Sequence, residues 1–267
     1  MLPPNRLKKR IQSGRQSLGT WVQSGSATFA EIAALAGLDF LIVDQEHGPS
    51  DLSGAIDAMR ATACMETTVV IRVPSADPVS LRRLVDAGAQ ALLVPMVESA
   101  ETARAIVEAV RFPPQGKRGN AAEITRSSRY GLVPDYYERA NDSLLIIVQV
   151  ETPAGVENAA QIAAVDGVDV VFIGPTDLSC SMGLPGQTGA PEVEAAIRQT
   201  VEAVRAADKP LATVPRAGRT LNDLAGEGYA MLASGSDIAI YRAAVQSMLR
   251  EWKGRGELPQ AGSAYAR

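Results

Sequence analysis

The sequence predicts a (β/α)8 barrel, in which eight parallel strands alternate with helices and close on themselves. A length of 267 residues fits one such barrel. Short strand-like runs bounded by Gly, Pro or Asp alternate with Ala-rich amphipathic stretches along the chain. Two of the runs, 40–43 and 144–148, are continuously apolar, which is typical of parallel strands buried on both faces. An open doubly wound sheet normally carries a glycine-rich phosphate turn after an early strand, and none occurs here. We therefore predict a single barrel domain over residues 1–267, with 254–267 as a polar tail.

The individual elements follow from this alternation. The predicted strands are Leu18–Gln23, Phe40–Asp44, Thr68–Val73, Ala91–Pro95, Leu144–Val150, Val168–Ile173, Leu211–Val214 and Ala230–Ala233. The predicted helices are Thr28–Leu35, Val79–Asp86, Ala100–Arg111, Val156–Ala164, Pro191–Ala207, Thr220–Glu227 and a final amphipathic helix, Asp237–Lys253. The basic cluster of residues 6–10 is expected to solvate an N-terminal helix. The long connection from Glu98 to Ser143 is expected to be functional, because connections of this length are uncommon in compact domains.

Composition excludes several classes of protein. Hydrophobic residues make up 46% and charged residues 21% of the chain, so a large core can form. The net charge of −4 argues against a nucleic-acid partner, which would favour a basic face. No apolar run approaches the roughly 20 residues needed to cross a bilayer, and Met1 leads into prolines and charges rather than a signal peptide. Two cysteines make neither a disulfide framework nor a metal spacing, so we expect a cytoplasmic protein with free thiols.

Polar side chains cluster where the predicted strands end. Catalytic residues of such barrels gather at the carboxyl ends of the strands. Those ends carry Asp44, Glu46, His47, Arg72, Gln149, Glu151 and the segment Gly174-Pro-Thr-Asp177. Each residue also has a structural interpretation: either aspartate could cap a helix or turn, Glu151 could pair with Arg72, and His47 could belong to a turn. Four strand ends carrying charge at one barrel mouth nevertheless indicate a site, since buried charge is costly without a purpose.

The residue types indicate a metal-assisted reaction on a 2-oxo acid. Two carboxylates, Glu151 and Asp177, suit a hard divalent cation such as Mg²⁺ or Mn²⁺, and there is no second His for a zinc site. A 2-oxo acid could chelate such a cation, while the fork of Arg72 or backbone N–H groups at Thr176 and Asp177 could hold its carboxylate. The cation would stabilise an enolate, and His47, oriented by Asp44, could move the proton.

The positions of the lysines argue against the rival mechanism, a Schiff-base aldolase. That mechanism needs a lysine at a strand end inside the barrel. The five lysines are Lys8, Lys9, Lys117, Lys209 and Lys253, and none is expected there. Lys209 precedes the seventh predicted strand, which should place it at the opposite end of the barrel.

Several motifs resemble the HpcH/HpaI aldolases, within the wider group of phosphoenolpyruvate/pyruvate-binding barrels. The motifs are Gly19-Thr-Trp-Val, Asp44-Gln-Glu-His47, Val70-Ile-Arg-Val-Pro74, Val148-Gln-Val-Glu151 and Gly174-Pro-Thr-Asp-Leu-Ser179. The resemblance extends from about residue 19 to residue 248. It implies a class II pyruvate aldolase that reversibly cleaves 4-hydroxy-2-oxo acids to pyruvate, or an analogue such as hydroxypyruvate, and an aldehyde.

The resemblance also implies roles for individual residues. Glu151 and Asp177 would hold Mg²⁺, Mn²⁺ or Co²⁺, Arg72 would contact the pyruvate oxygens, and His47 with Asp44 would be the acid/base pair. Glu46 and Gln149 would support these groups, and Thr176 would donate through its backbone; the predicted substrate-binding set also contains Gln149, Asp177, Trp21 and Val214. Family members commonly form hexamers in which a C-terminal helix packs on a neighbouring barrel.

Two segments depart from the family pattern. The Arg-Gly motif in 116–119 continues as Asn120-Ala-Ala-Glu-Ile-Thr instead of a run of small residues, and 213–218 reads Thr-Val-Pro-Arg-Ala-Gly. Both segments are expected to shape the aldehyde side of the pocket. The competing functions are a CoA-thioester lyase like the citrate lyase β subunit, which the Asp44–His47 motif disfavours, and a non-catalytic pyruvate-binding barrel.

Overall fold

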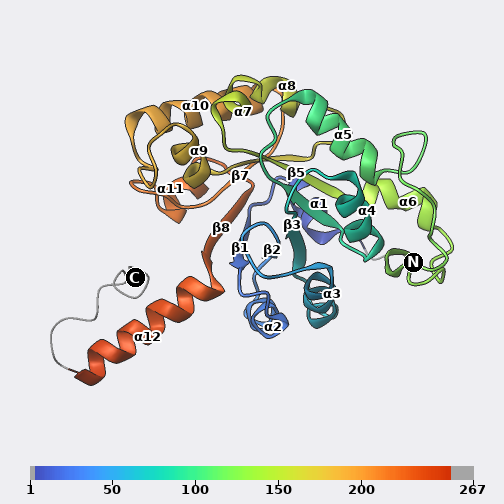
Figure 1. The fold of residues 1–267 in the computed structure, drawn as a ribbon, viewed down its shortest axis with the longest axis horizontal. Helices are drawn as coiled ribbons and strands as arrows, with labels where there is room; N and C mark the ends of the chain where they lie inside the picture. The colour runs from blue at the N-terminus through green and yellow to red at the C-terminus, as the bar shows by residue number, and fades with distance from the viewer. Residues whose placement is uncertain (1–3, 254–267) are drawn as a thin grey trace, which may run out of the picture.

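A computed structural model describes residues 4–253, in which eight parallel strands form a closed barrel in chain order (Figure 1). The strands are β1 (Ser17–Val22), β2 (Phe40–Asp44), β3 (Thr68–Arg72), β4 (Ala91–Val94), β5 (Leu145–Val150), β6 (Val170–Ile173), β7 (Leu211–Thr213) and β8 (Met231–Ser236). Each strand pairs with the next, and β1 pairs with β8 to close the ring. The predicted (β/α)8 barrel is thus confirmed, strand by strand.

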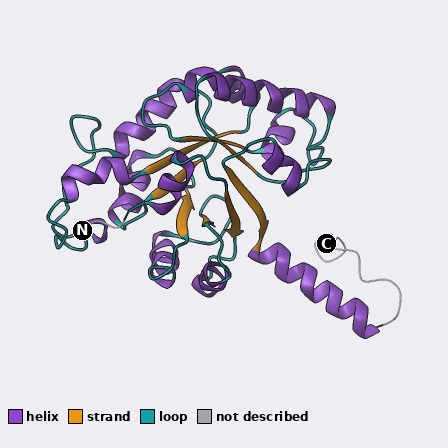
Figure 2. Ribbon diagram, turned by 180° about the vertical axis from the view of Figure 1, so that it is seen from behind, coloured by secondary structure: helices purple, strands orange, loops and turns teal. Residues whose placement is uncertain are grey.

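The helices surround the barrel on the outside (Figure 2). They are α1 (Arg6–Gln12), α2 (Ala27–Leu35), α3 (Leu52–Ala61), α4 (Pro78–Asp86), α5 (Ala100–Val110), α6 (Tyr136–Ser143), α7 (Pro153–Glu157), α8 (Ala159–Ala163), α9 (Pro175–Ser181), α10 (Pro191–Ala206), α11 (Leu221–Gly226) and α12 (Asp237–Lys253), with a short 3-10 helix, η1 (Arg126–Ser128). Three of them, α3, α6 and α9, were not predicted over these bounds.

The helix predicted over 156–164 was wrong in extent, because the structure divides this region into α7 and α8. The break lies at Asn158, whose backbone leaves helical geometry at φ −96° and ψ 5°. Its side-chain amide donates to the carbonyl of Glu98 at 2.8 Å. A side chain that bonds to distant backbone competes with helix continuation, which accounts for the break.

Alternate residues of the strands fill the barrel interior. Phe40 and Ile42 on β2 point inward with Leu145, Ile147 and their counterparts on the other strands, whereas the residues between them pack under the helices. Helix α1 closes the amino-terminal end of this core with Leu7 and Ile11. The interior is therefore packed, and chemistry is confined to the other end.

Helix α1 is less solvated than its basic sequence predicted. Lys8 is buried, and its Nζ donates to the carbonyl of Leu144 at 2.5 Å and lies 3.0 Å from Asp169. A buried lysine with a carboxylate and a carbonyl partner holds α1 against the starts of β5 and β6. The expectation of a solvated basic cluster was wrong at this residue.

Helix α12 projects away from the barrel (Figure 1). Its start is anchored by Asp237, whose carboxylate accepts from the backbone N–H groups of Gln23 and Ser24 at 2.8 and 3.1 Å. Beyond this anchor several of its apolar side chains are exposed, among them Tyr241 at 63% and Met248 at 61%. Within residues 4–253 no helix combines the length and the apolar character needed to cross a membrane. The predicted tail, 254–267, lies outside the described residues.

Candidate active site

Asp44 and Arg72 form a buried ion pair at the carboxyl ends of β2 and β3. They are register partners, which puts their side chains side by side. Arg72 Nε donates to Asp44 Oδ1 at 2.9 Å, and its Nη2 to Oδ2 at 2.6 Å. Burial alone would raise the pKa of Asp44, but the hydrogen bonds and charge of Arg72 bring it below its ordinary value. The carboxylate is thus held ionised by a two-pronged contact.

This pairing changes the expected role of the Arg72 fork. The sequence predicted that the fork would hold a substrate carboxylate, but two of its donors, Nε and Nη2, already bind Asp44. Its Nη1 lies 3.1 Å from Glu46, and its guanidinium stacks 4.5 Å from the ring centre of Trp21. The alternative pairing with Glu151 is not observed. Arg72 therefore bridges two acids and an aromatic ring, and fixes the geometry of the mouth.

His47 lies next to Glu46 rather than beside the carboxylate of Asp44. Asp44 Oδ1 accepts from the backbone N–H groups of Glu46 and His47 at 3.1 and 3.2 Å, so it shapes the turn that carries the imidazole. The imidazole is 59% exposed, and its Nε2 lies 3.9 Å from Glu46 Oε2. The expectation that Asp44 orients the imidazole directly is not matched by this geometry; Glu46 is the neighbouring acid.

Glu151 is a buried carboxylate at the end of β5. It is 2% exposed, and Oε1 accepts from the backbone N–H of Met96 at 2.8 Å, while Gln149 Nε2 donates to Oε2. Burial is the main cause that raises its pKa to about 7, and the charge of Asp177 adds to the increase. Within residues 4–253 it has no basic partner, which leaves its negative charge uncompensated.

Asp177 lies in the first turn of α9, directly after β6. The helix begins at Pro175, with Gly174 at the N-cap, so Asp177 is inside the helix and is not its cap. Its charge raises the pKa of both Glu151 and Glu46, although burial is the larger cause for each. Thr176 is exposed beside it. The structure therefore brings together the two predicted metal ligands and adds Glu46 to their electrostatic surroundings.

Trp21 and Val214 border the same end of the barrel. Trp21 lies near the end of β1 and packs edge-on against Phe172, with ring centres 6.1 Å apart. Val214 is half-buried and packs on the inner core of the barrel just after β7. These apolar surfaces flank the polar groups, as an organic substrate requires.

Two positioning elements were not predicted from the sequence. Met96, after β4, adopts a left-handed backbone at φ 55°, which is uncommon for a residue with a side chain and turns its N–H toward Glu151. Gly174 lies so close to Glu151 that a Cβ there would be 2.6 Å from Oε2 and 2.8 Å from Gln149 Nε2. The glycine was visible in the sequence motif, but no sequence signal marks the conformation of Met96.

The two segments that depart from the family pattern do not reach this mouth through their charged side chains. Arg216, after β7, donates to Glu194 on α10 through Nε at 2.6 Å and Nη2 at 3.1 Å. Arg118 binds Asp86 at 2.6 Å, near the start of β4 and at the opposite end of the barrel. The expectation that 116–125 shapes the aldehyde side is not met by contacts within this chain.

Lys209 and Lys8 lie far from the carboxyl ends of the strands, where a Schiff-base lysine would have to be. Lys209 donates to the carbonyl of Val168, ahead of β6, and Lys8 lies ahead of β5. Both are at the amino ends of the strands, away from Glu151 and Asp177.

Comparisons with known proteins assign the barrel and its mouth to one family. The HpcH/HpaI aldolase/citrate lyase family matches residues 17–244. A hydroxypyruvate/pyruvate aldolase of Agrobacterium fabrum is 39% identical over 263 residues, 97% of each chain, and a 2-keto-3-deoxy-L-rhamnonate aldolase of Escherichia coli is 36% identical over 98% of each. The crystal structure of an HpcH/HpaI aldolase/citrate lyase family protein from Burkholderia cenocepacia superposes with a TM-score of 0.88 at 33% identity, covering 93% of this chain and 99% of that one.

The closed (β/α)8 barrel and the similarity to aldolases define the class as a barrel lyase. This chain belongs to the HpcH/HpaI aldolase/citrate lyase family. The predicted family and enzyme class, an aldolase, are confirmed. Aldolases of class II in this family are typically metal-dependent.

Proposed function

We propose that this chain cleaves a 4-hydroxy-2-oxo acid into pyruvate or hydroxypyruvate and an aldehyde, with a divalent cation held by Glu151 and Asp177. The observation that carries the proposal is the buried Glu151, whose charge has no basic partner within residues 4–253 and is opposed by Asp177. The names of the relatives, hydroxypyruvate/pyruvate aldolase and 2-keto-3-deoxy-L-rhamnonate aldolase, support a 2-oxo acid substrate.

The donor set fits a hard cation that keeps ligands from outside the protein. Within the described residues no group of three or more His, Cys, Asp or Glu could surround a metal. Two carboxylates leave several positions for substrate oxygens and water, as Mg²⁺ and Mn²⁺ commonly require in enzymes. Met96 and Gln149 fix the two oxygens of Glu151, and ordered ligands of this kind strengthen binding. When bound, the cation supplies positive charge that stabilises negative charge developing on the 2-oxo oxygen.

Arg72 binds and orients the 2-oxo acid in this proposal. Nε and Nη2 bind Asp44 and Nη1 lies 3.1 Å from Glu46, so the second hydrogen of Nη1 is the donor that faces a substrate oxygen. The N–H groups at the start of α9, near Thr176, offer further donors to a carboxylate. Trp21, held under the guanidinium of Arg72, and Val214 exclude water from the apolar part of the substrate.

His47 moves the proton between the 4-hydroxyl and C3 of the substrate. Its imidazole is accessible from the mouth, and Nε2 lies within 3.9 Å of Glu46, which can stabilise the protonated ring. The acid/base pair that we propose is therefore His47 with Glu46, and Asp44 acts on it through the turn and through Arg72.

Retro-aldol activity provides the direct test. A panel of 4-hydroxy-2-oxo acids is incubated with the enzyme, and released pyruvate or hydroxypyruvate is measured before and after chelation. We expect turnover that chelation abolishes and that Mg²⁺, Mn²⁺ or Co²⁺ restores to different degrees. Full activity in protein shown to be metal-free by elemental analysis would exclude the metal site, and absence of turnover on the whole panel would exclude the aldolase.

We further propose that the chain forms a homo-oligomer, a hexamer, in which α12 packs on a neighbouring subunit. The exposed apolar residues of α12 and of α2 support this, including Ile32 at 55% and Leu35 at 69% on α2. Phe29 and Tyr241 already contact each other, which joins the two exposed surfaces. Light scattering at micromolar concentration tests the proposal, and a monomeric mass would contradict it.

A further inference from the structure

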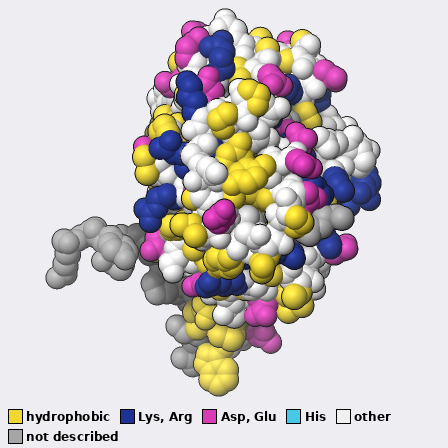
Figure 3. Space-filling model, turned by 90° about the vertical axis from the view of Figure 1, so that its right-hand side faces the viewer, with side chains coloured by type: hydrophobic (Ala, Val, Ile, Leu, Met, Phe, Trp, Pro, Cys, Tyr) yellow, Lys and Arg dark blue, Asp and Glu magenta, His cyan; other side chains and the backbone are white. Residues whose placement is uncertain are grey.

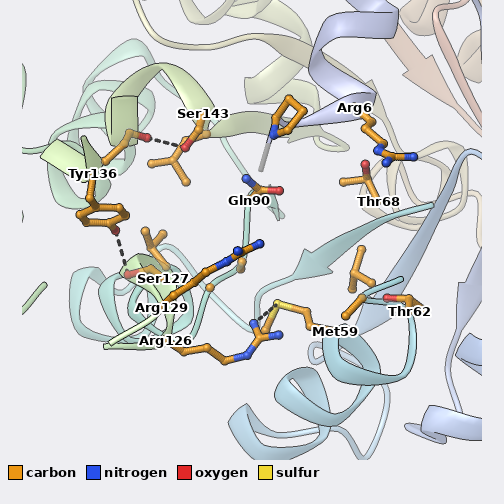
Figure 4. A pocket seen from close by; sticks show the side chains of 18 of the residues that line it. Arg6, Met59, Thr62, Thr68, Gln90, Arg126, Ser127, Arg129, Tyr136 and Ser143 are labelled. Carbon is orange, nitrogen blue, oxygen red and sulfur yellow. Dashed lines mark hydrogen bonds between the residues drawn. The ribbon is translucent and has the colours of Figure 1, made fainter. Parts of the chain in front are cut away.

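A second cavity lies at the amino ends of β3, β4 and β5, at the end of the barrel opposite Glu151. It has a volume of about 410 Å³, which is within the range of small-molecule sites. Its walls come from α1, α3, η1, α6 and the starts of the three strands. Figure 4 shows Arg126 and Arg129 on one side of it and Arg6 with Thr68 on the other. None of these residues belongs to the catalytic mouth.

The charge of this cavity is entirely basic. Four arginines, Arg6, Arg118, Arg126 and Arg129, line it, and the other polar groups on its described walls are neutral, with no aspartate or glutamate among them. The outer surface on this side of the molecule instead carries basic and acidic side chains interspersed (Figure 3). In a chain with a net charge of −4, four converging arginines are not a consequence of composition.

The arginines differ in whether their charge is compensated. Arg6 pairs with Glu66 and Arg118 with Asp86, whereas Arg126 and Arg129 make no ion pair within residues 4–253. Arg126 donates to the carbonyl of Ala87 at 3.0 Å. Burial lowers the pKa of Arg126, and the nearby charge of Arg60 lowers it further. An anion in the cavity would relieve both effects.

The backbone is shaped to hold these two side chains in place. Gly88, at φ +100°, lies directly under Arg126, where a Cβ would be 2.6 Å from Nη1. Arg129 and Tyr130 are both left-handed, at φ 56° and 59°, although neither is a glycine. Consecutive residues in this region cost free energy, and such strain is concentrated at binding and switch sites.

We propose that this cavity binds a small organic polyanion, recognised by Arg126 and Arg129 and by hydroxyl groups such as those of Thr68 and Ser127. Two unpaired guanidiniums match two anionic groups on one ligand, since each offers several donors in a plane. Dicarboxylates and phosphate monoesters share this chemistry. Because the cavity and the catalytic mouth are at opposite ends of the barrel, the ligand and pyruvate bind independently in space.

Calorimetric titration of the full-length protein, loaded with Mn²⁺ so that the catalytic mouth can also bind pyruvate, tests this. The probes are succinate and glycerol 2-phosphate, with glycerol and sodium chloride as controls. The variant Arg126→Gln/Arg129→Gln removes both unpaired charges, and Arg15→Gln/Arg83→Gln removes two exposed arginines elsewhere as its matched control. We expect one of the two polyanions to bind and the first variant to lose about tenfold or more in affinity, as for lost hydrogen bonds between charged groups. The control should bind as the wild type does.

Absence of binding by both polyanions at millimolar concentration would overturn the proposal, as would an equal loss in the control variant. Displacement of the polyanion by pyruvate would assign the binding to the catalytic mouth instead. If the double variant fails to fold, Arg129→Gln alone serves, because Arg129 is exposed at the surface of the cavity. Preference for succinate or for the phosphate ester identifies which anion the site selects.

Discussion

Replacing Glu151 by glutamine should remove the pH dependence of stability that this carboxylate gives to the metal-free protein. An unfolded chain releases the proton of a glutamate near pH 4.5, whereas folded Glu151 has a pKa of about 7, mainly because it is buried. Between these values the folded state binds more protons, so the free energy of unfolding decreases as pH rises. The decrease is about 3 kcal/mol in total, at about 1.4 kcal/mol for each pKa unit, and is complete above pH 7.

Glutamine can keep both hydrogen bonds that Glu151 makes, although Gln149 Nε2 then takes the buried position where its Oε1 has no partner. Its oxygen can accept from Met96 N–H as Glu151 Oε1 does. Its nitrogen would face Gln149 Nε2, but the Gln149 amide can turn over and present Oε1, which is buried without a partner. Glu151→Gln should therefore fold, and its stability relative to wild type should increase by about 3 kcal/mol between pH 4.5 and pH 8.

Urea unfolding at a fixed protein concentration and in the presence of a chelator measures this difference. The surface substitution Glu31→Gln removes one charge without the burial and is the control. Saturating Mn²⁺ at pH 8 should stabilise the wild type but not Glu151→Gln, because binding to the folded state alone increases stability. Parallel pH curves for wild type and Glu151→Gln would refute the argument that Glu151 is a strained, metal-ready carboxylate.

Three further substitutions test the mouth. Arg72→Lys should lose about a hundredfold or more in kcat/KM, because an ammonium group cannot bond both oxygens of Asp44 and also reach Glu46; near-wild-type kinetics would contradict this. Gly174→Ala should lower the free energy of unfolding by about 1–3 kcal/mol, because its Cβ would lie 2.6 Å from the buried Glu151 Oε2. It should also weaken Mn²⁺ binding about tenfold by displacing that carboxylate, and unchanged affinity by calorimetry would show that the carboxylate can move freely. His47→Ala should slow both cleavage and proton exchange of pyruvate by about a hundredfold, and rates within a few-fold of wild type would exclude His47 as the proton carrier.

The barrel could be predicted because its strands are buried on both faces and therefore read as continuous apolar runs. The strands predicted over Phe40–Asp44 and Leu144–Val150 were found in this way, with bounds within one residue of those observed. The polar residues at the strand ends could also be located, because the topology places every such end at the same mouth. The ion-pair partners of these polar residues could not be predicted. Asp44 and Glu151 are both acids at strand ends, yet one is taken by Arg72 and the other is left without a cation.

The remaining differences come from tertiary contacts that local sequence does not record. Lys8 looked like a surface lysine because its neighbours are basic, but its partners, Leu144 and Asp169, lie far along the chain. The left-handed backbone of Met96 is held by its bond to Glu151, and nothing in its own sequence favours that conformation. In both cases the difference from the sequence-based prediction arises at a contact with a residue far along the chain: Lys8 with Asp169, and Met96 with Glu151.

The charge of the mouth gives a reason for the order in which ligands bind. Four acids, Asp44, Glu46, Glu151 and Asp177, act on one another there, and Arg72 is the basic residue that pairs with two of them. Burial raises the pKa of Glu46 and raises that of Glu151 to about 7, and the charge of Asp177 adds to both increases. An anionic 2-oxo acid would meet the same repulsion, so we expect the proposed divalent cation to bind before it. Equal affinity of metal-free and metal-loaded protein for pyruvate would be incompatible with that order.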